Sequence, residues 1–247
     1  MRVERAEISL IGARDSNQDR VATVVAGDTT LAVVCDGMGG HSAGERAAEI
    51  ATKVICDRFA EITKPLFDPL GFMNLALGAA HQRVVQFGLG IPVEVRPRAT
   101  CALCLVQDGS TYWAHIGDSR VYLLRRGRIV TRTRDHSHVE LLLREGLIDV
   151  DQMQGHPMRN FVESCIGGES LLPEMTLSPR YALSSGDILL TCTDGLWGNL
   201  DDESLAGAFG AADQPLTSSL TAIAERAVGA GGGAADNTSA IALRCMD

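Results

Sequence analysis

Aromatic residues are scarce in this chain of 247 residues, where phenylalanine, tryptophan and tyrosine together make up only 4%. Aliphatic residues and alanine must therefore build the core, because hydrophobic residues of all kinds reach 45%. Long apolar runs are also lacking, whereas a membrane-spanning helix needs about 20 apolar residues in a row. Residues 1–5 do not form the apolar core of a signal peptide. We therefore expect a cytoplasmic protein without membrane insertion.

Positive charge is the minority sign, with 22 lysines and arginines against 31 aspartates and glutamates and a net charge of −9. Surfaces that bind nucleic acids are rich in Lys and Arg because they neutralise phosphates. We therefore expect no nucleic acid as a main partner.

Clustered cysteines are absent as well: seven are scattered along the chain, which suits reduced thiols in a cytosolic compartment. Cys101 and Cys104 have the spacing of a metal-binding pair, but they lie in an expected strand, where residues three apart point to opposite faces. We interpret both as buried core thiols.

The remaining patterns predict strands and helices in separate groups. Strands are expected at residues 6–11, 21–26, 30–35, 100–107, 111–116, 121–124, 129–133 and 239–244, with another beginning at Asp187. Helices are expected after a capping box at Ser42 and Glu45, from Pro69 to Gly88, and at residues 139–145, 202–209 and 215–228. A flexible glycine-rich loop is expected at residues 229–233. Antiparallel strand runs with paired helices favour an α+β fold, and the lack of repeats or linkers predicts one domain over residues 1–247.

Five aspartates share one position in this pattern, because each lies where an apolar run meets a loop. They are Asp19, Asp36, Asp118, Asp194 and Asp236. A carboxylate at the end of a buried strand is held rigidly, and several that converge repel one another unless a cation lies between them. The pattern therefore indicates a site for hard metal ions, and it favours hydrolytic chemistry.

These aspartates belong to an ordered set of motifs. In chain order the motifs are Gly12-x-Arg14-x-x-Asn17-Gln18-Asp19, Asp36-Gly37-Met38-Gly39-Gly40-His41, Gly117-Asp118-Ser119-Arg120, Thr133-x-Asp135-His136-Ser137, His156-Pro157-x-Arg159-Asn160, Thr193-Asp194-Gly195-Leu196-Trp197 and Asp236-Asn237-x-Ser239. From about residue 8 to residue 243, this order resembles the metal-dependent Ser/Thr protein phosphatases of the PP2C (PPM) family, in their bacterial single-domain form. The resemblance implies a four-layer α-β-β-α sandwich, with two antiparallel sheets flanked by helix pairs and metals at one end between the sheets.

The resemblance also implies the cofactors, which are two Mn²⁺ or Mg²⁺ ions and a third, weaker one. These ions prefer carboxylate, carbonyl and water ligands. Two such ions about 3.5–4 Å apart can share a water and lower its pKa, so that hydroxide attacks phosphorus. The positions that match metal ligands are Asp36 as the bridge, Asp194 and Asp236 on the first ion, Asp19 and the Gly37 carbonyl on the second, and Asp118 on the third. Gln18 stands where Glu is commoner, and we expect altered metal affinity from it.

Three further residues complete the expected site. Arg14 matches the phosphate clamp, since a guanidinium can grip two phosphate oxygens. His41 either protonates the departing Ser/Thr oxygen or caps the helix beside it. Residues 135–173 match a variable flap, in which Arg159 contacts phosphopeptide, whereas His136 and His156 are expected to join the flap to the body. Trp197 is expected to be a core anchor.

The leading hypothesis is a protein phosphatase acting on phosphoserine and phosphothreonine, a monomer that opposes a bacterial Ser/Thr kinase and acts on its substrates. One alternative is a non-catalytic scaffold of the same fold that binds phosphoproteins, although such a protein should have lost metal ligands. A second is a two-metal nuclease or phosphodiesterase, which the acidic charge and missing basic groove disfavour.

Overall fold

The computed structural model of the protein describes residues 1–39, 43–211 and 213–247. The strands are β1 (Arg2–Leu10), β2 (Arg20–Ala26), β3 (Thr29–Cys35), β4 (Gly37–Met38), β5 (Arg98–Ala99), β6 (Cys101–Gln107), β7 (Ser110–Ile116), β8 (Arg120–Arg125), β9 (Arg128–Arg132), β10 (Ile166–Gly167), β11 (Thr176–Leu177), β12 (Tyr181–Ala182), β13 (Ile188–Cys192) and β14 (Thr238–Met246). The helices are α1 (Ala43–Glu61), α2 (Pro69–Phe87), α3 (His138–Arg144), α4 (Val150–Met153), α5 (Asp194–Trp197), α6 (Asp202–Gly207) and α7 (Leu216–Gly231), with 3₁₀ turns η1 (Val93–Val95) and η2 (Gly232–Ala234).

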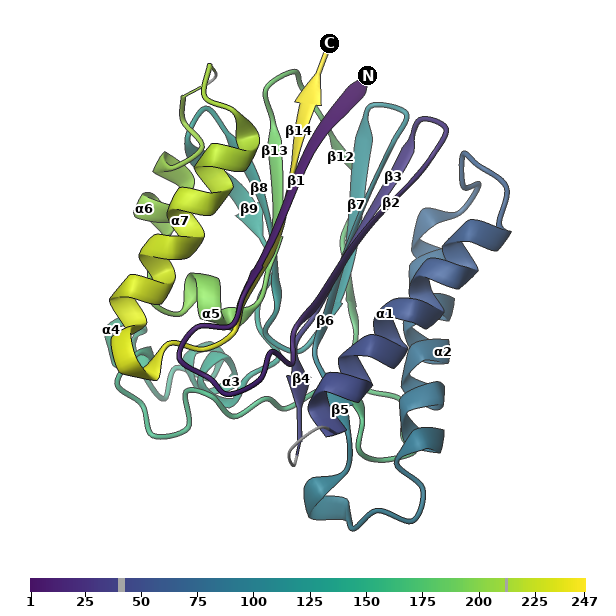
Figure 1. Cartoon of the computed structure of the whole chain (residues 1–247), viewed down its shortest axis with the longest axis vertical. Coiled ribbons are helices and arrows are strands. Elements are labelled where there is room, and N and C mark those ends of the chain that lie inside the picture. The colour runs from purple at the N-terminus through teal and green to yellow at the C-terminus, as the bar shows by residue number, and fades with distance from the viewer. Residues whose placement is uncertain (40–42, 212) are drawn as a thin grey trace.

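Two antiparallel sheets face each other at the centre of the molecule (Figure 1). In the ranges described above, the first sheet has the strand order β1-β14-β13-β8-β9, and the second has the order β11-β7-β6-β3-β2, with β12 also paired to β7. Helices α1 and α2 cover the second sheet, and α5, α6 and α7 cover the first. The short strands β4, β5 and β10 pair at one end of the sandwich. The predicted α+β sandwich of four layers is confirmed.

The central strands are buried on both faces, which explains their nearly continuous apolar sequences. In β3, Val33 packs under α1 and α2, whereas Val34 packs between the two sheets. Cys101 and Cys104 divide in the same way: Cys101 faces the helices and Cys104 faces the other sheet. The prediction that these two thiols are core residues on opposite faces is confirmed, and both are free thiols.

Most predicted elements occur within a few residues of their expected bounds. Helix α2 begins as expected, with Pro69 in its first turn and the Asp68 carboxylate accepting a hydrogen bond from the Gly71 amide at 2.9 Å. Ser42, the first residue of the predicted capping box, lies outside the described residues. Its expected partner, Glu45, pairs with Arg20 of β2. No helix in the described part of the chain is long and apolar enough to span a membrane.

The glycine-rich stretch at residues 229–233 was wrongly predicted to be a flexible loop. Helix α7 continues to Gly231, and η2 follows it directly. The helix forms despite its glycines because its apolar face packs against the first sheet. This packing outweighs the helix-propensity penalty of about 1 kcal/mol for each glycine. The position is closely packed, since a Cβ on Gly231 would lie 3.0 Å from both Asn199 Nδ2 and the Ala235 Cβ.

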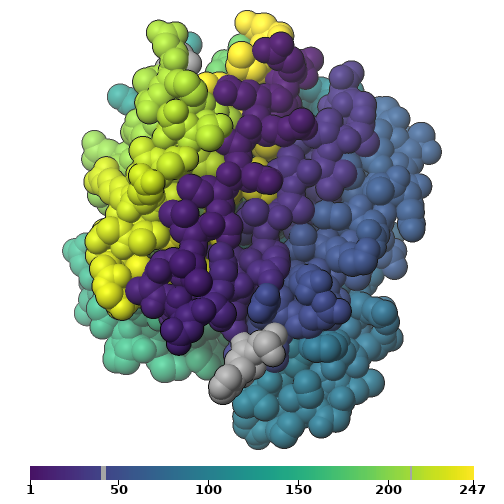
Figure 2. Space-filling view, viewed as in Figure 1, coloured from purple at the N-terminus to yellow at the C-terminus, as the bar shows by residue number. Residues whose placement is uncertain are grey.

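Strand β1 is longer than predicted because it pairs with β14 along its whole length, from Arg2 opposite Met246 to Leu10 opposite Thr238. Its first residues are polar and partly exposed, so they lack an apolar pattern that could mark a strand. Figure 2 shows this N-terminal segment on the surface, between α7 and the part of the chain that contains β2. The two ends of the described chain thus lie side by side.

Candidate metal and phosphate site

The five strand-end aspartates come together at one end of the sandwich, near α5 and β4 (Figure 1). They follow β3, β7 and β13 or precede β2 and β14, so both sheets supply them. Asp19 is 2% exposed and Asp118 is 6% exposed, while the other members are partly buried. Converging strand ends therefore place these carboxylates together below the surface, as the sequence predicted.

Burial and mutual repulsion make the ionised form of these carboxylates unfavourable, which raises their pKa values. Burial raises the pKa of Asp36 well above its ordinary value, and the charges of the other aspartates of the set raise it further. Burial also raises the pKa of Asp19 to about 7, against hydrogen bonds that lower it. The pKa of Asp194 rises to about 6, from burial first and then from the charge of Asp236. The pKa of Asp118 is raised well above its usual range by burial and then by Asp194. The cluster is an unbalanced concentration of negative charge.

The donor set fits hard divalent cations. Asp19 accepts a hydrogen bond from the Thr193 hydroxyl on Oδ2 at 2.9 Å, yet its Oδ1 atom is buried without any partner in the described residues. Within those residues, no three His, Cys, Asp or Glu side chains already close around a single ion position. Mg²⁺ and Mn²⁺ do not need such a cage, because Mg²⁺ is usually held by one or two carboxylates and keeps several waters. An oxygen-only donor set with an orphaned carboxylate oxygen suits these ions.

Gly37 lies at a point of close backbone approach beside the cluster. A Cβ atom at this position would lie 2.1 Å from the carbonyl oxygen of Gly44, in the first turn of α1. Only glycine lets β4 pass so close to the helix, and the fold thereby keeps the backbone that follows Asp36 near the other aspartates.

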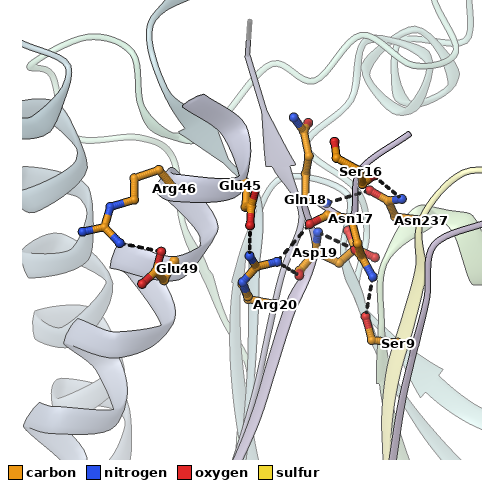
Figure 3. Close-up of polar contacts among 10 residues, drawn as sticks. All are labelled: Ser9, Ser16, Asn17, Gln18, Asp19, Arg20, Glu45, Arg46, Glu49 and Asn237. Atoms are coloured by element: carbon orange, nitrogen blue, oxygen red, sulfur yellow. Dashed lines mark hydrogen bonds and ion pairs between the residues drawn. The ribbon is translucent and has the colours of Figure 1, made fainter. Parts of the chain in front are cut away.

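The loop between β1 and β2 is fastened to the start of β14 by one amide (Figure 3). The Asn237 Oδ1 atom accepts a hydrogen bond from the Gln18 amide at 2.8 Å, and its Nδ2 atom donates to the carbonyl oxygens of Ile11 at 2.8 Å and Ser16 at 3.0 Å. Asn237 is 6% exposed, so losing these bonds would leave polar groups buried. It therefore fixes the loop that carries Arg14 and Asp19.

Arg14 lies at the exposed rim of the cluster. Its Nη2 atom is 2.6 Å from Asp236 Oδ2, and the two side chains are 56% and 40% exposed. A guanidinium at a solvent-facing edge of a carboxylate cluster is accessible to an incoming anion. The structure therefore brings Arg14 to the predicted site, in contact with one of its aspartates.

Sequence reasoning missed a buried support for the Asp118 turn. The Arg120 guanidinium donates to both oxygens of Asp135 at 2.8 and 2.7 Å and stacks 3.4 Å from the Trp197 ring centroid. The Trp197 indole N–H in turn donates to the carbonyl oxygen of Asp118 at 3.1 Å. Trp197 is thus a structural anchor, as expected, but it anchors the site itself. The available signal was an arginine two residues after Asp118, at the start of an apolar strand.

The other predicted site residues lie elsewhere. The Arg159 side chain donates to Asn160 Oδ1 at 3.1 Å and to the Gln154 carbonyl at 3.2 Å, within its own segment. His136 accepts from the Gly117 amide at 3.2 Å, so it joins the flap segment to the body as predicted. His156 instead accepts from the Met158 amide within its own turn at 3.1 Å. His41 lies outside the described residues.

Two facing sheets with buried carboxylates gathered at one end are the architecture of metal-dependent phosphatases. The family model for protein phosphatase 2C matches residues 9–228, and the chain belongs to this family.

Relatives of known name agree with this assignment. The chain is 30% identical over 242 residues to the protein phosphatase PhpP of Streptococcus pneumoniae, covering 92% of this chain and 93% of PhpP. It is 31% identical over 201 residues to the serine/threonine protein phosphatase PstP of Mycobacterium tuberculosis, covering 79% of this chain and only 36% of PstP. The chain therefore spans about a third of the length of PstP.

Solved structures share the fold. The structure of the S. agalactiae serine/threonine phosphatase has a TM-score of 0.90 at 25% identity, with 99% of this chain and 100% of that chain covered. The catalytic domain of PstP, in complex with two manganese ions, has a TM-score of 0.82 at 26% identity, with 99% of each chain covered.

Proposed function

We propose that the protein is a serine/threonine phosphatase that removes phosphate from phosphoserine and phosphothreonine in proteins, opposing a Ser/Thr kinase. The observation that carries this proposal is the largely buried cluster of five aspartates, in which the buried Oδ1 atom of Asp19 has no hydrogen-bond partner among the described residues. Such a cluster is unfavourable unless cations neutralise it. The manganese complex of PstP supports the choice of Mn²⁺ or Mg²⁺ for this chain.

We assign the metal-holding residues as the family resemblance implies. Asp36 would bridge two ions, with Asp194 and Asp236 on one side and Asp19 and the Gly37 carbonyl on the other, and Asp118 would serve a third. When bound, such ions supply positive charge that lowers the pKa of water and stabilises charge on a phosphoryl group.

Arg14 would bind the phosphate of the substrate. Its guanidinium already contacts Asp236, so an incoming phosphate competes with that carboxylate for the same N–H donors. The guanidinium would release Asp236 and donate two parallel hydrogen bonds to two phosphate oxygens. Orientation of the phosphate at the cluster's rim is therefore the task of Arg14.

The remaining assignments concern the surroundings of the site. We propose that residues 1–247 act as one domain and as a monomer, with residues 135–173 as a flap beside the site. Arg159, held inside that segment, would contact the phosphopeptide rather than the phosphorus centre. His41 is our candidate for the group that delivers a proton to the departing Ser/Thr oxygen.

The test is the release of inorganic phosphate from a phosphothreonine peptide. We expect turnover with Mn²⁺, none with excess EDTA, and none in the Asp36→Asn variant at full Mn²⁺. Asp28→Asn, in the exposed turn between β2 and β3, is the matched control and should keep wild-type rates. Turnover that survives Asp36→Asn would sink the assignment, and peptide binding without any turnover would favour the scaffold alternative.

A second measurement separates the role of Arg14 from that of the cluster. Arg14→Ala should mainly raise KM and leave kcat closer to wild type, because it removes a binding contact. Arg14→Lys should restore only part of the loss, since an ammonium cannot form the two parallel bonds of a guanidinium. An unchanged KM in Arg14→Ala would contradict the clamp role.

A further inference from the structure

A pair of thiols lies directly beneath the aspartate cluster. Cys35 ends β3 and Cys101 begins β6, and their Sγ atoms are 3.3 Å apart with no exposed surface on either residue. Val34 pairs with Ala102 in the ladder between these strands, so Cys35 and Cys101 stand directly opposite each other. Both side chains face α1 and α2.

The local hydrogen bonds show that this pair suits a covalent bond. The Thr100 amide donates to the Asp36 carbonyl at 2.8 Å, which makes those residues the hydrogen-bonded pair of the ladder. The neighbouring Cys35 and Cys101 are then a non-hydrogen-bonded pair, the class in which opposite Cα atoms approach to about 4.5 Å. That separation lies within the range found for disulfides, about 4.4–6.8 Å.

The pair is also one residue away from the groups that build the site. Asp36 follows Cys35, and Thr100 precedes Cys101. The Thr100 hydroxyl contacts the Ser119 hydroxyl at 2.7 Å, and Ser119 follows Asp118. A change in the spacing of the two strands at this point is therefore transmitted to Asp36 directly and to the Asp118 turn through Thr100.

We propose that Cys35 and Cys101 are a modification site: a two-electron oxidant of the hydroperoxide class converts them to a reversible disulfide that weakens divalent-metal binding at Asp36. The disulfide does not depend on the proposed function, whereas its effect on metal binding rests on the proposed role of Asp36 as a metal ligand. The S–S bond of about 2.05 Å is over 1 Å shorter than the present contact and needs a Cβ–S–S–Cβ dihedral of about ±90°, so both side chains must reorient, and the bond then fixes the spacing of the two strand ends.

The chemistry balances with hydrogen peroxide as the oxidant. One sulfur, as thiolate, attacks a peroxide oxygen; the O–O bond breaks, and a sulfenic acid and one water form. The second sulfur then attacks the sulfenic sulfur, the S–O bond breaks, and the oxygen leaves as a second water. Two thiols lose two electrons and two protons, and a dithiol reductant reverses the reaction by exchange.

Burial controls the rate of this reaction. Burial raises the pKa of Cys101 well above its ordinary value, and the neighbouring thiol Cys35 adds to the effect, so the reactive thiolate is scarce. Cys56 on α1 is only partly buried, and its pKa of about 11 reflects burial first and then the nearby Cys35. We expect slow oxidation that requires opening of α1, faster at higher pH, and not the rapid response of an exposed sensor thiol.

The first experiment maps the bond in the full chain. Metal-free protein is incubated with hydrogen peroxide, alkylated under denaturing conditions, digested and analysed by mass spectrometry. We expect a Cys35–Cys101 cross-linked peptide and two thiols fewer available for alkylation, both reversed by dithiothreitol. Cys101→Ala and Cys35→Ala should each abolish the cross-link, whereas Cys56→Ala should retain it. Absence of this cross-link in wild type after exhaustive oxidation overturns the proposal.

The second experiment measures Mn²⁺ binding by calorimetry on reduced and oxidised protein. We expect affinity to fall about tenfold or more on oxidation in wild type, and to stay constant in Cys101→Ala under the same treatment. A cross-link that leaves Mn²⁺ affinity unchanged refutes the regulatory part. If the reduced protein hydrolyses no phosphopeptide, the proposed function fails, but the cross-link and the Mn²⁺ affinities still decide this proposal.

Discussion

Raising the pH of the metal-free protein should destabilise it, which is the reverse of the usual behaviour of paired carboxylates. Asp19 has a pKa of about 7 in the folded chain instead of its ordinary 3.8. A group whose pKa is raised by folding binds its proton more tightly in the native state. Its stabilising contribution is complete below the unfolded pKa and is lost as the pH rises through the folded pKa.

The magnitude follows from the same two values. They differ by about 3 units, and each unit corresponds to about 1.4 kcal/mol. The contribution of Asp19 to the unfolding free energy is therefore about 4 kcal/mol at low pH, and about 3 kcal/mol of it is lost between about pH 5 and about pH 8. Asp194, with a pKa raised to about 6, acts in the same direction. For a chain of this length, 1 kcal/mol moves the melting temperature by about 2–4 °C. We expect a fall on the order of 10 °C.

The assay is thermal unfolding in EDTA from about pH 5 to about pH 8. This range spans the folded-state pKa values of Asp194, about 6, and Asp19, about 7. Asp19→Asn should melt near wild type at the acidic end and above it at the alkaline end, because the amide cannot acquire the buried charge. Asp28→Asn, outside the cluster, should follow wild type. Added Mn²⁺ should restore stability at the alkaline end, since an ion that binds only the folded state stabilises it. A melting temperature that is constant or rises over this range in EDTA would refute the reasoning.

Three further substitutions test the supports of the site. Asn237→Ala removes three hydrogen bonds of a buried amide and should lower the unfolding free energy in urea by about 2–3 kcal/mol; a loss below about 0.5 kcal/mol would contradict its fastening role. Trp197→Phe keeps an aromatic ring but loses the hydrogen bond to the Asp118 carbonyl, and should lower the unfolding free energy in urea by about 1 kcal/mol; an unchanged urea midpoint would contradict this role. Gly12→Ala places a Cβ 2.2 Å from the Asp236 carbonyl oxygen at a φ of +64° and should destabilise by more than about 2 kcal/mol; wild-type melting would show that the loop relaxes freely.

The gathering of the five aspartates at one end of the sandwich could be predicted because each carries its own local signal. Asp36 directly follows an apolar run, and Asp194 follows one after a single threonine. The end of a strand fixes where such a side chain can lie. The order and spacing of the motifs then resemble those of a known family. This resemblance predicts that residues far apart in the sequence share one site, which no local pattern could show. The two-sheet architecture followed from the same source and from the grouping of strands.

The supports of the site could not be predicted, because they depend on contacts between distant segments. Nothing near Arg120 indicates that its partner is Asp135, or that its guanidinium stacks on Trp197. Strands β4, β5 and β10 have two residues each, too few to show an alternating pattern. The glycines of α7 are helical because of tertiary packing and against their low helix propensity.

The pairing of β1 with β14 has a consequence for the order of assembly. Arg14 and Asp19 follow the first strand, Asp236 and Asn237 precede the last, and the two strands close the longest loop of the described chain. Strands β2, β3, β6 and β7 with α1 and α2 can associate earlier through shorter loops. During synthesis, Asp36 and Asp118 therefore emerge well before Asp236, which precedes β14. The carboxylate cluster is therefore complete only once β14 has paired with β1, and proteolysis of β14 would also remove the Ile241 and Leu243 side chains that pack against the other sheet.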